Sequence, residues 1–138
     1  MITGITFGAF DLLHPGHVTF LKDCKLRCDR LFVGLHVDPS LQSPSKNKPA
    51  QTVVERWIQL DALRHVDMII PYETERDLIG MLCHLSVQKR FLGSEYESGT
   101  RRIVGEDYCG MLNIEIVMVP RLHHWSSTEL RERIKSGA

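Results

Sequence analysis

Apolar runs alternate along this chain with segments in which apolar residues recur at helical spacing. The apolar, β-prone runs predict five strands, at residues 2–7, 30–37, 68–71, 87–92 and 113–119. Helical spacing predicts a helix that starts around His14–His17, helices over 52–63 and 73–86, and a last helix that opens at 125–128. Strands that alternate with helices indicate an α/β fold built on one parallel, doubly wound sheet.

Two of these helices start with a recognisable cap. Thr52 with Glu55, and Ser126 with Glu129, have the spacing of a capping box. In the helix over 52–63, Trp57 is predicted to face the core.

Composition narrows the class of protein. The 138 residues predict one domain, residues 1–138, and the 17 basic and 17 acidic side chains cancel, which argues against a nucleic-acid partner. No apolar run approaches the ~20 residues of a membrane span, and the N-terminus does not read as a signal peptide. We therefore expect a cytoplasmic protein whose four cysteines stay reduced. No cysteine spacing fits a tight metal-ligand set, so no protein metal site is predicted.

The stretch from Phe7 to His17 is the strongest candidate for chemistry. A strand runs into Gly8, a tight turn follows, and His14 and His17 stand three residues apart at the start of a helix, on one face. Backbone N–H groups at a helix start bind anions. The pattern therefore predicts a site for the phosphates of a nucleoside triphosphate.

This stretch also carries a resemblance. The pattern G-x-F-D-x-x-H-x-G-H, present at Gly8, Phe10, Asp11, His14, Gly16 and His17, resembles the signature of the cytidylyltransferase-like nucleotidyltransferases. The run from Thr6 to His17 is most similar to glycerol-3-phosphate cytidylyltransferases. The resemblance implies a Rossmann-like five-stranded sheet of order 3-2-1-4-5 and a homodimer. It also implies that a small phosphomonoester attacks the α-phosphate of CTP and expels pyrophosphate, with Mg²⁺ accompanying the triphosphate.

The loop over residues 38–52 contains two lysines near the predicted site. In view of the resemblance, Lys46 or Lys48 is expected to contact phosphate, and the sequence does not choose between them. His36, at the end of the second strand, could approach the site or lie in solvent. Asp11 is expected to accept hydrogen bonds within the turn rather than to bind metal.

Two other segments match the family only in part. Arg64 and Asp67 fall in an R-x-V-D pattern that in relatives supports the site and the subunit contact, although an ordinary ion pair at the helix end is an equal alternative. Gly93-Ser94-Glu95-Tyr96 resembles G-x-[DE]-[WY]. The second substrate is expected to be selected in the polar, glycine-containing stretch over 94–110.

The last motif leaves the choice of base open. Arg121, Ser126, Ser127 and Thr128 fall on the family's R-T-E-G-[IV]-S-T-[TS], but Leu122, His123, His124, Trp125 and Ser127 depart from it. The Ser-Ser-Thr run followed by Arg131 is also similar to adenylyltransferases, which would use ATP. His123 and His124 could be loop residues, base-stacking groups or metal ligands.

The sequence thus predicts a nucleotidyltransferase, with an adenylyltransferase, a non-catalytic nucleotide-binding module and a metal-binding structural protein as alternatives. The expected catalytic residues are His14, His17, Lys46, Lys48 and Arg121, with Asp11, Arg64 and Asp67 in support. The expected nucleotide-binding residues are Phe7, Gly8, Ala9, Phe10, His14, Gly16, His17, Gly93, Arg121, Trp125, Ser126, Ser127 and Thr128.

Overall fold

The fold is centred on one parallel sheet, seen in a computed structural model that describes residues 1–137. Its strands are β1 (Thr3–Gly8), β2 (Arg30–His36), β3 (Met68–Tyr72), β4 (Lys89–Gly93) and β5 (Glu115–Val119). They lie in the order β3-β2-β1-β4-β5, and every pair is parallel. The predicted doubly wound sheet and its strand order are confirmed.

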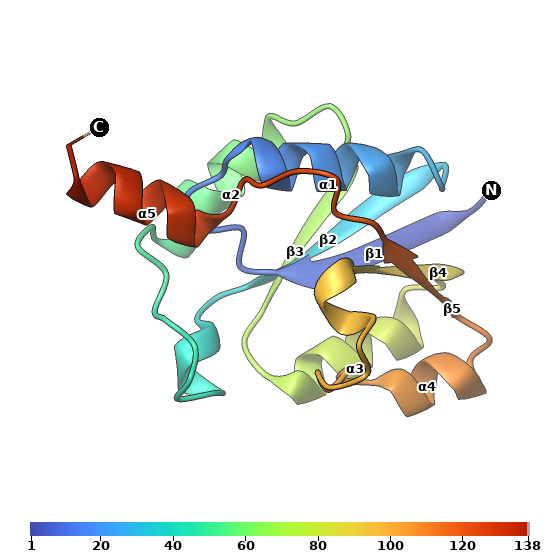
Figure 1. The fold of residues 1–138 in the computed structure, drawn as a ribbon. Coiled ribbons are helices and arrows are strands. Elements are labelled where there is room, and N and C mark those ends of the chain that lie inside the picture. The colour runs from blue at the N-terminus through green and yellow to red at the C-terminus, as the bar shows by residue number, and fades with distance from the viewer. Residues whose placement is uncertain (138) are drawn as a thin grey trace.

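Helices cover both faces of this sheet. The helices α1 (Pro15–Lys25) and α2 (Val53–Asp61) lie on one face, and α3 (Glu75–His84) and α4 (Glu106–Met111) lie on the other (Figure 1). The short helices η1 (Pro39–Leu41) and η2 (Ser94–Tyr96) follow β2 and β4 directly, and α5 (Ser127–Lys135) ends the fold. None of the helices in residues 1–137 is long and apolar enough to cross a membrane.

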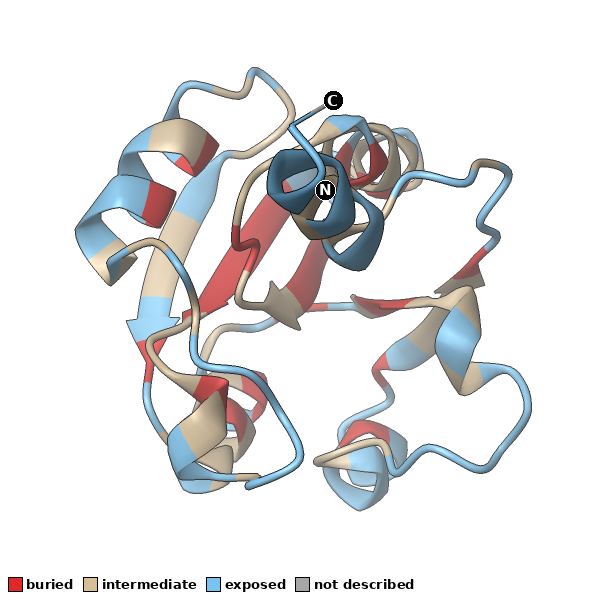
Figure 2. Cartoon of the chain, turned by 60° about the vertical axis from the view of Figure 1, so that its left-hand side comes forward, coloured by how far each residue is buried: buried red, intermediate tan, exposed pale blue. Residues whose placement is uncertain are grey.

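The core consists of two apolar clusters, one on each face of the sheet. Leu21, Leu35 and Leu60 belong to the cluster under α1 and α2, and Leu82 and Cys109 belong to the cluster under α3 and α4. Buried positions are concentrated in the central strands, and the outer surfaces of the helices are exposed (Figure 2). The sheet is therefore a rigid base for the loops at its carboxyl edge.

The stretch over residues 94–110, to which the sequence assigned no element, is partly helical. It contains η2 and most of α4. The left-handed backbone of Gly105, with φ of 79°, turns the chain into α4 and lets Cys109 pack into the core. The helix has only six residues, too few to show a helical period in the sequence.

The inward face of α2 also differs from the prediction. Thr52 caps the helix in the expected box with Glu55, but Trp57 is 40% exposed. Arg56 takes the inward position, because its guanidinium donates to the carbonyl oxygens of Ala9 at 3.0 Å and Val37 at 2.6 Å. These bonds tie α2 to the ends of β1 and β2.

Candidate functional site

The turn after β1 holds its shape through strained backbone. Phe10 and Leu12 adopt left-handed conformations with φ of 49° and 51°. Residues other than glycine rarely adopt such backbone angles, which cost on the order of 1–2 kcal/mol each. The side chain of Gln51 helps to hold the turn, since its Oε1 accepts from the Leu12 N–H at 2.8 Å.

Asp11, between the two strained residues, is the anchor of this turn. Its carboxylate accepts hydrogen bonds from the N–H groups of Ala50 at 2.8 Å and Gln51 at 2.9 Å. Arg131 of α5 pairs with it at 2.7 Å. In this structure Asp11 is thus a hydrogen-bond acceptor that joins three distant segments, as expected of a turn-stabilising residue.

The two histidines of the motif cap α1 and face each other. His14 is the N-cap, and its Nδ1 accepts from the Gly16 N–H at 3.0 Å. His17 Nδ1 accepts from the His14 N–H at 3.3 Å, and the two rings stack with centroids 3.9 Å apart. An imidazole whose Nδ1 accepts carries its proton on Nε2 when neutral. Each ring therefore presents an Nε2–H donor, and that of His14 lies 3.2 Å from Ser127 Oγ.

Both imidazoles are neutral at pH 7. Burial, followed by the neighbouring His14, lowers the pKa of His17 to about 3. Burial also lowers the pKa of His14, with further contributions from His123 and Arg121. A neutral Nε2–H can donate to a phosphate oxygen without first losing or gaining a proton.

Gly16 makes room for this group of rings. A methyl group on Gly16 would lie 2.7 Å from Cε1 of His14 and 2.9 Å from Cε1 of His123. His123 thus approaches the motif from the segment between β5 and α5. Its Nδ1 accepts from the Trp125 N–H at 3.2 Å, and its ring stacks on Trp125 with centroids 5.2 Å apart.

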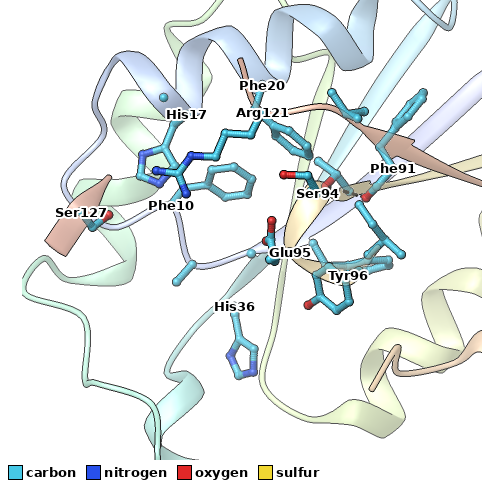
Figure 3. A pocket seen from close by; sticks show the side chains of 18 of the residues that line it. Phe10, His17, Phe20, His36, Phe91, Ser94, Glu95, Tyr96, Arg121 and Ser127 are labelled. Atoms are coloured by element: carbon cyan, nitrogen blue, oxygen red, sulfur yellow. Dashed lines mark hydrogen bonds between the residues drawn. The ribbon is translucent and has the colours of Figure 1, made fainter. Parts of the chain in front are cut away.

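The start of α5 completes this end of the site. Ser126 caps the helix and accepts from the Glu129 N–H at 3.0 Å, but the reciprocal bond of the predicted capping box is not formed in the described chain. Arg121 donates to the Trp125 carbonyl oxygen at 2.6 Å. Its side chain extends toward His17 (Figure 3). The hydroxyl groups of Ser126 and Ser127 and the guanidinium of Arg121 thus line the cavity together with the two histidines, near the free N–H groups at the start of α5.

These groups open onto one cavity of about 830 Å³. Most of the predicted residues line it: Phe7, Gly8, Ala9, Phe10, His14, Gly16, His17, Lys46, Gly93, Arg121, Trp125, Ser126 and Ser127. Lys48 and Thr128 are exposed and do not line it. The structure thus brings Lys46, rather than Lys48, to the site.

Arg64 and Asp67 lie away from this cavity. Asp67 pairs with Lys25 of α1 and accepts from the Leu31 N–H at 2.8 Å. It therefore ties α1 to the adjacent ends of β2 and β3 and makes no ion pair with Arg64 in the described chain. The ion pair at the helix end, which was the alternative drawn from the sequence, is thus replaced by a contact between Asp67 and another helix.

The opposite end of the cavity combines residues that had a sequence signal with residues that had none. Tyr72, Arg90 and Arg101 line it together with His36 and Lys46. Figure 3 shows His36 on the opposite side of the cavity from His17, with Glu95 and Tyr96 of η2 between the two ends. Only His36, Lys46 and the Glu95–Tyr96 motif had a sequence signal. The others are polar residues of strands and loops without a motif.

No group of three or more metal-ligating side chains occurs among residues 1–137. The carboxylate of Asp11 is occupied by Arg131 and two backbone N–H groups. This carboxylate is therefore already satisfied by groups of the protein.

Comparison with known proteins relates most of the chain to one family. The family described as Cytidylyltransferase-like matches residues 5–133. Proteins named Bifunctional protein HldE from Nitrobacter winogradskyi and Bradyrhizobium diazoefficiens are 33% and 35% identical over 94% and 98% of this chain. The chain spans only about a quarter of those relatives, 26% and 27% of their length.

Solved structures share the fold. The lipopolysaccharide core biosynthesis protein from Thermoplasma volcanium has a TM-score of 0.69 at 23% identity, over 91% of this chain and 99% of that one. Pantothenate synthetase from Thermus thermophilus has a TM-score of 0.59 at 14% identity, over 96% of this chain and 64% of that one. At these identities the likeness concerns the arrangement of strands and helices alone.

Proposed function

The chain belongs to the cytidylyltransferase-like family, and we propose that it transfers a nucleotidyl group from a nucleoside triphosphate to a small phosphomonoester. One observation carries the proposal. The neutral, stacked imidazoles of His14 and His17 open with Nε2–H donors onto the cavity that also holds Arg121 and the start of α5. The family match confirms the resemblance drawn from residues 8–17.

In the proposed reaction, an oxygen of the phosphomonoester forms a bond to the α-phosphorus of the nucleotide. The bond from that phosphorus to the bridging oxygen breaks, and pyrophosphate leaves with the electron pair. The attacking phosphate is already anionic at neutral pH, so no general base is needed. Catalysis then rests on positioning the reactants and stabilising charge.

The side chains have separate roles in this scheme. His14 and His17 donate hydrogen bonds to the α-phosphate and the phosphate chain as charge builds up. Arg121 neutralises charge on the pentacoordinate phosphorus and the leaving pyrophosphate, and the long side chain of Lys46 extends toward them from the opposite end of the cavity. Ser126 and Ser127 present the α5 start to the terminal phosphates. Magnesium, bound through phosphate oxygens and water, would shield the charge of the triphosphate.

Two donors fit the family. The first-strand motif favours CTP. The stacked pair of His123 and Trp125, where the family pattern has Glu and Ile or Val, favours ATP, since a purine offers the larger face for stacking on aromatic rings. We propose ATP as the donor and keep CTP as the second candidate.

Thermal-shift titrations with ATP, CTP, GTP and UTP will separate these donors. ATP is expected to raise the melting temperature most, and the Trp125→Ala variant is expected to lose that preference. His124→Ala is the matched control, because His124 lies in the same loop but does not line the cavity. A larger shift with CTP in the unaltered protein would instead support the second candidate.

A coupled assay for pyrophosphate tests catalysis itself. Release of pyrophosphate that depends on both a triphosphate and a phosphomonoester is expected. Nucleotide binding without any release would make the chain a binding module instead. The homodimer implied by the resemblance stays a prediction, which sedimentation velocity can test on the same preparation.

A further inference from the structure

Arg90 of β4 is a buried arginine without a counter-ion. It is 3% exposed and lines the cavity at the end opposite the histidines. Its Nη1 donates to the Val104 carbonyl oxygen and lies 4.0 Å from Cys109 Sγ, but its buried Nε has no hydrogen-bond partner. The ion pairs formed among residues 1–137 do not include Arg90.

Arg56 shows how this fold treats an arginine that serves only the structure. It is 1% exposed, and all three of its guanidinium nitrogens donate to backbone carbonyl oxygens. In Arg90 the edge formed by Nε and Nη2 makes no hydrogen bond within the described chain. A buried charge left in this state is costly, so a ligand that completes it would bind strongly.

The position of Arg90 separates it from the reacting centre. It pairs with Ile5 in the register of β1 and β4, three residues before β4 ends at Gly93. At about 3.3 Å per residue, this places its backbone roughly 10 Å below the edge of the sheet where the histidine motif begins. The guanidinium lies over the Phe7 ring, with Cζ 5.1 Å from the ring centroid.

A second unpartnered polar atom lies at the same end of the cavity. His36 Nδ1 is buried and makes no hydrogen bond within the described chain, and its ring packs on Tyr72 with centroids 4.6 Å apart. Tyr72 in turn packs on Phe7 in an edge-to-face arrangement, with ring centroids 5.6 Å apart. Aromatic walls and unused polar atoms of this kind are typical of a ligand subsite.

The charges around this end favour an anion. Lys46 and Arg101, which precede α2 and α4, line the cavity here beside the buried guanidinium. Of the two carboxylates, Glu75 is paired with Arg102 at 3.1 Å, while Glu95 lies against Gly93. The cations thus outnumber the carboxylates that are free to neutralise them.

We propose that Arg90 is the specificity-determining residue for the acceptor, and that it binds a second oxyanion at the end of the acceptor remote from the reacting phosphate. The acceptor is then a phosphorylated sugar or polyol that also bears a carboxylate or a second phosphate. The proposal rests on the proposed nucleotidyl transfer. The free guanidinium edge suits such a group, because two parallel N–H donors match two oxygens of a carboxylate or phosphate.

Matched acceptors test this directly. Glucose 1-phosphate, glucuronic acid 1-phosphate and glucose 1,6-bisphosphate share a ring and a reacting phosphate and differ at the far end. With ATP, and in parallel with CTP, kcat/KM for pyrophosphate release is expected to be at least about tenfold higher for the two acceptors with a second anion. The better of these two identifies the oxyanion as carboxylate or phosphate.

Two variants tie that preference to Arg90. Arg90→Met is expected to abolish the preference while leaving the thermal shift caused by ATP unchanged, and Arg90→Lys is expected to keep part of it. A rise in KM for the two acceptors with a second anion, without a rise for glucose 1-phosphate, would mark specificity. General damage would affect every acceptor. Should Arg90→Met fail to fold, the ranking in the unaltered protein and in Arg90→Lys decides the matter.

Binding of the three acceptors is measured by thermal shift alongside the rates. Equal kcat/KM and equal binding for glucose 1-phosphate and the two acceptors with a second anion would overturn the role of Arg90 and leave nucleotidyl transfer intact. Binding that favours the acceptors with a second anion through Arg90, without pyrophosphate release from the nucleotide in the presence of any acceptor, would support the subsite and overturn the proposed function.

Discussion

The two ends of the cavity are built in different ways. At the histidine end, His14 and His17 come from one short stretch, and each Nδ1 is satisfied by backbone three residues away or fewer. At the other end, His36 and Arg90 come from different strands, and each keeps a buried polar atom unpartnered. If the proposed reaction is right, the phosphate chemistry is set by a local motif that is already held in place by its own backbone. Selection of the acceptor is left to scattered side chains that a ligand must complete.

The largest effect on turnover is expected from a substitution at the histidine end. His17→Ala removes one preorganised donor, and turnover should fall roughly a hundredfold or more, about 3 kcal/mol in the activation barrier. Steady-state pyrophosphate release measures it. The variant should still bind ATP, because Arg121 and the α5 start remain.

His84→Ala is the matched control for that variant. His84 is exposed at the end of α3 and lies outside the cavity, so its removal should leave turnover unchanged. A folded His17→Ala protein with unchanged turnover would remove His17 from the mechanism.

A smaller effect on turnover is expected from a substitution of Lys46. Lys46 lines the cavity, and its pKa is lowered by burial and by Arg101, whereas Lys48 does not line the cavity. Lys46→Ala should lower kcat about tenfold, as loss of one charge near the leaving group would. Lys48→Ala, two residues away, should have no effect on kcat. Equal losses in the two variants would mean that the loop rearranges on binding.

The last effect is on stability against acid and leaves turnover at pH 7 unchanged. Because the pKa of His17 is lowered in the folded protein to about 3, the unfolded chain binds its proton first as the pH falls below about 6.5. The free energy of unfolding should therefore be highest above that pH and fall by up to about 1.4 kcal/mol per unit as the pH drops toward 3.

Urea denaturation at pH 7 and pH 5 measures this slope. His17→Gln lacks the titrating ring and should lose less stability between the two pH values than the unaltered protein. The same loss in both proteins would assign the slope to other groups.

The sequence was sufficient wherever the signal is local. The five strands follow from apolar runs, and the histidine motif lies in eleven consecutive residues, so pattern and contact coincide. The strand order came from the family resemblance and not from periodicity. The choice between Lys46 and Lys48 required the path of the loop, which no pattern of residues encodes.

The buried arginines mark the limit of such reasoning. A polar residue within an apolar stripe is normally assigned to the surface, so Trp57 was placed inward where Arg56 belongs. Arg90 is buried because Val104, from a segment fourteen residues later, supplies a carbonyl acceptor. Contacts of this type depend on where the chain returns in space, and they were therefore invisible in the sequence.

The anchor at Asp11 has a consequence for the C-terminal helix. No side chain of α5 is buried. Its side chains are tied to the start of the chain by the ion pair of Arg131 with Asp11 and by hydrogen bonds of Ser127 with His14 and with the Asp11 carbonyl oxygen. Amides in α5 should therefore exchange with deuterium sooner than those of β1. A bound triphosphate that bridges the starts of α1 and α5 would slow that exchange. Amide exchange in α5 would then measure occupancy of the nucleotide site.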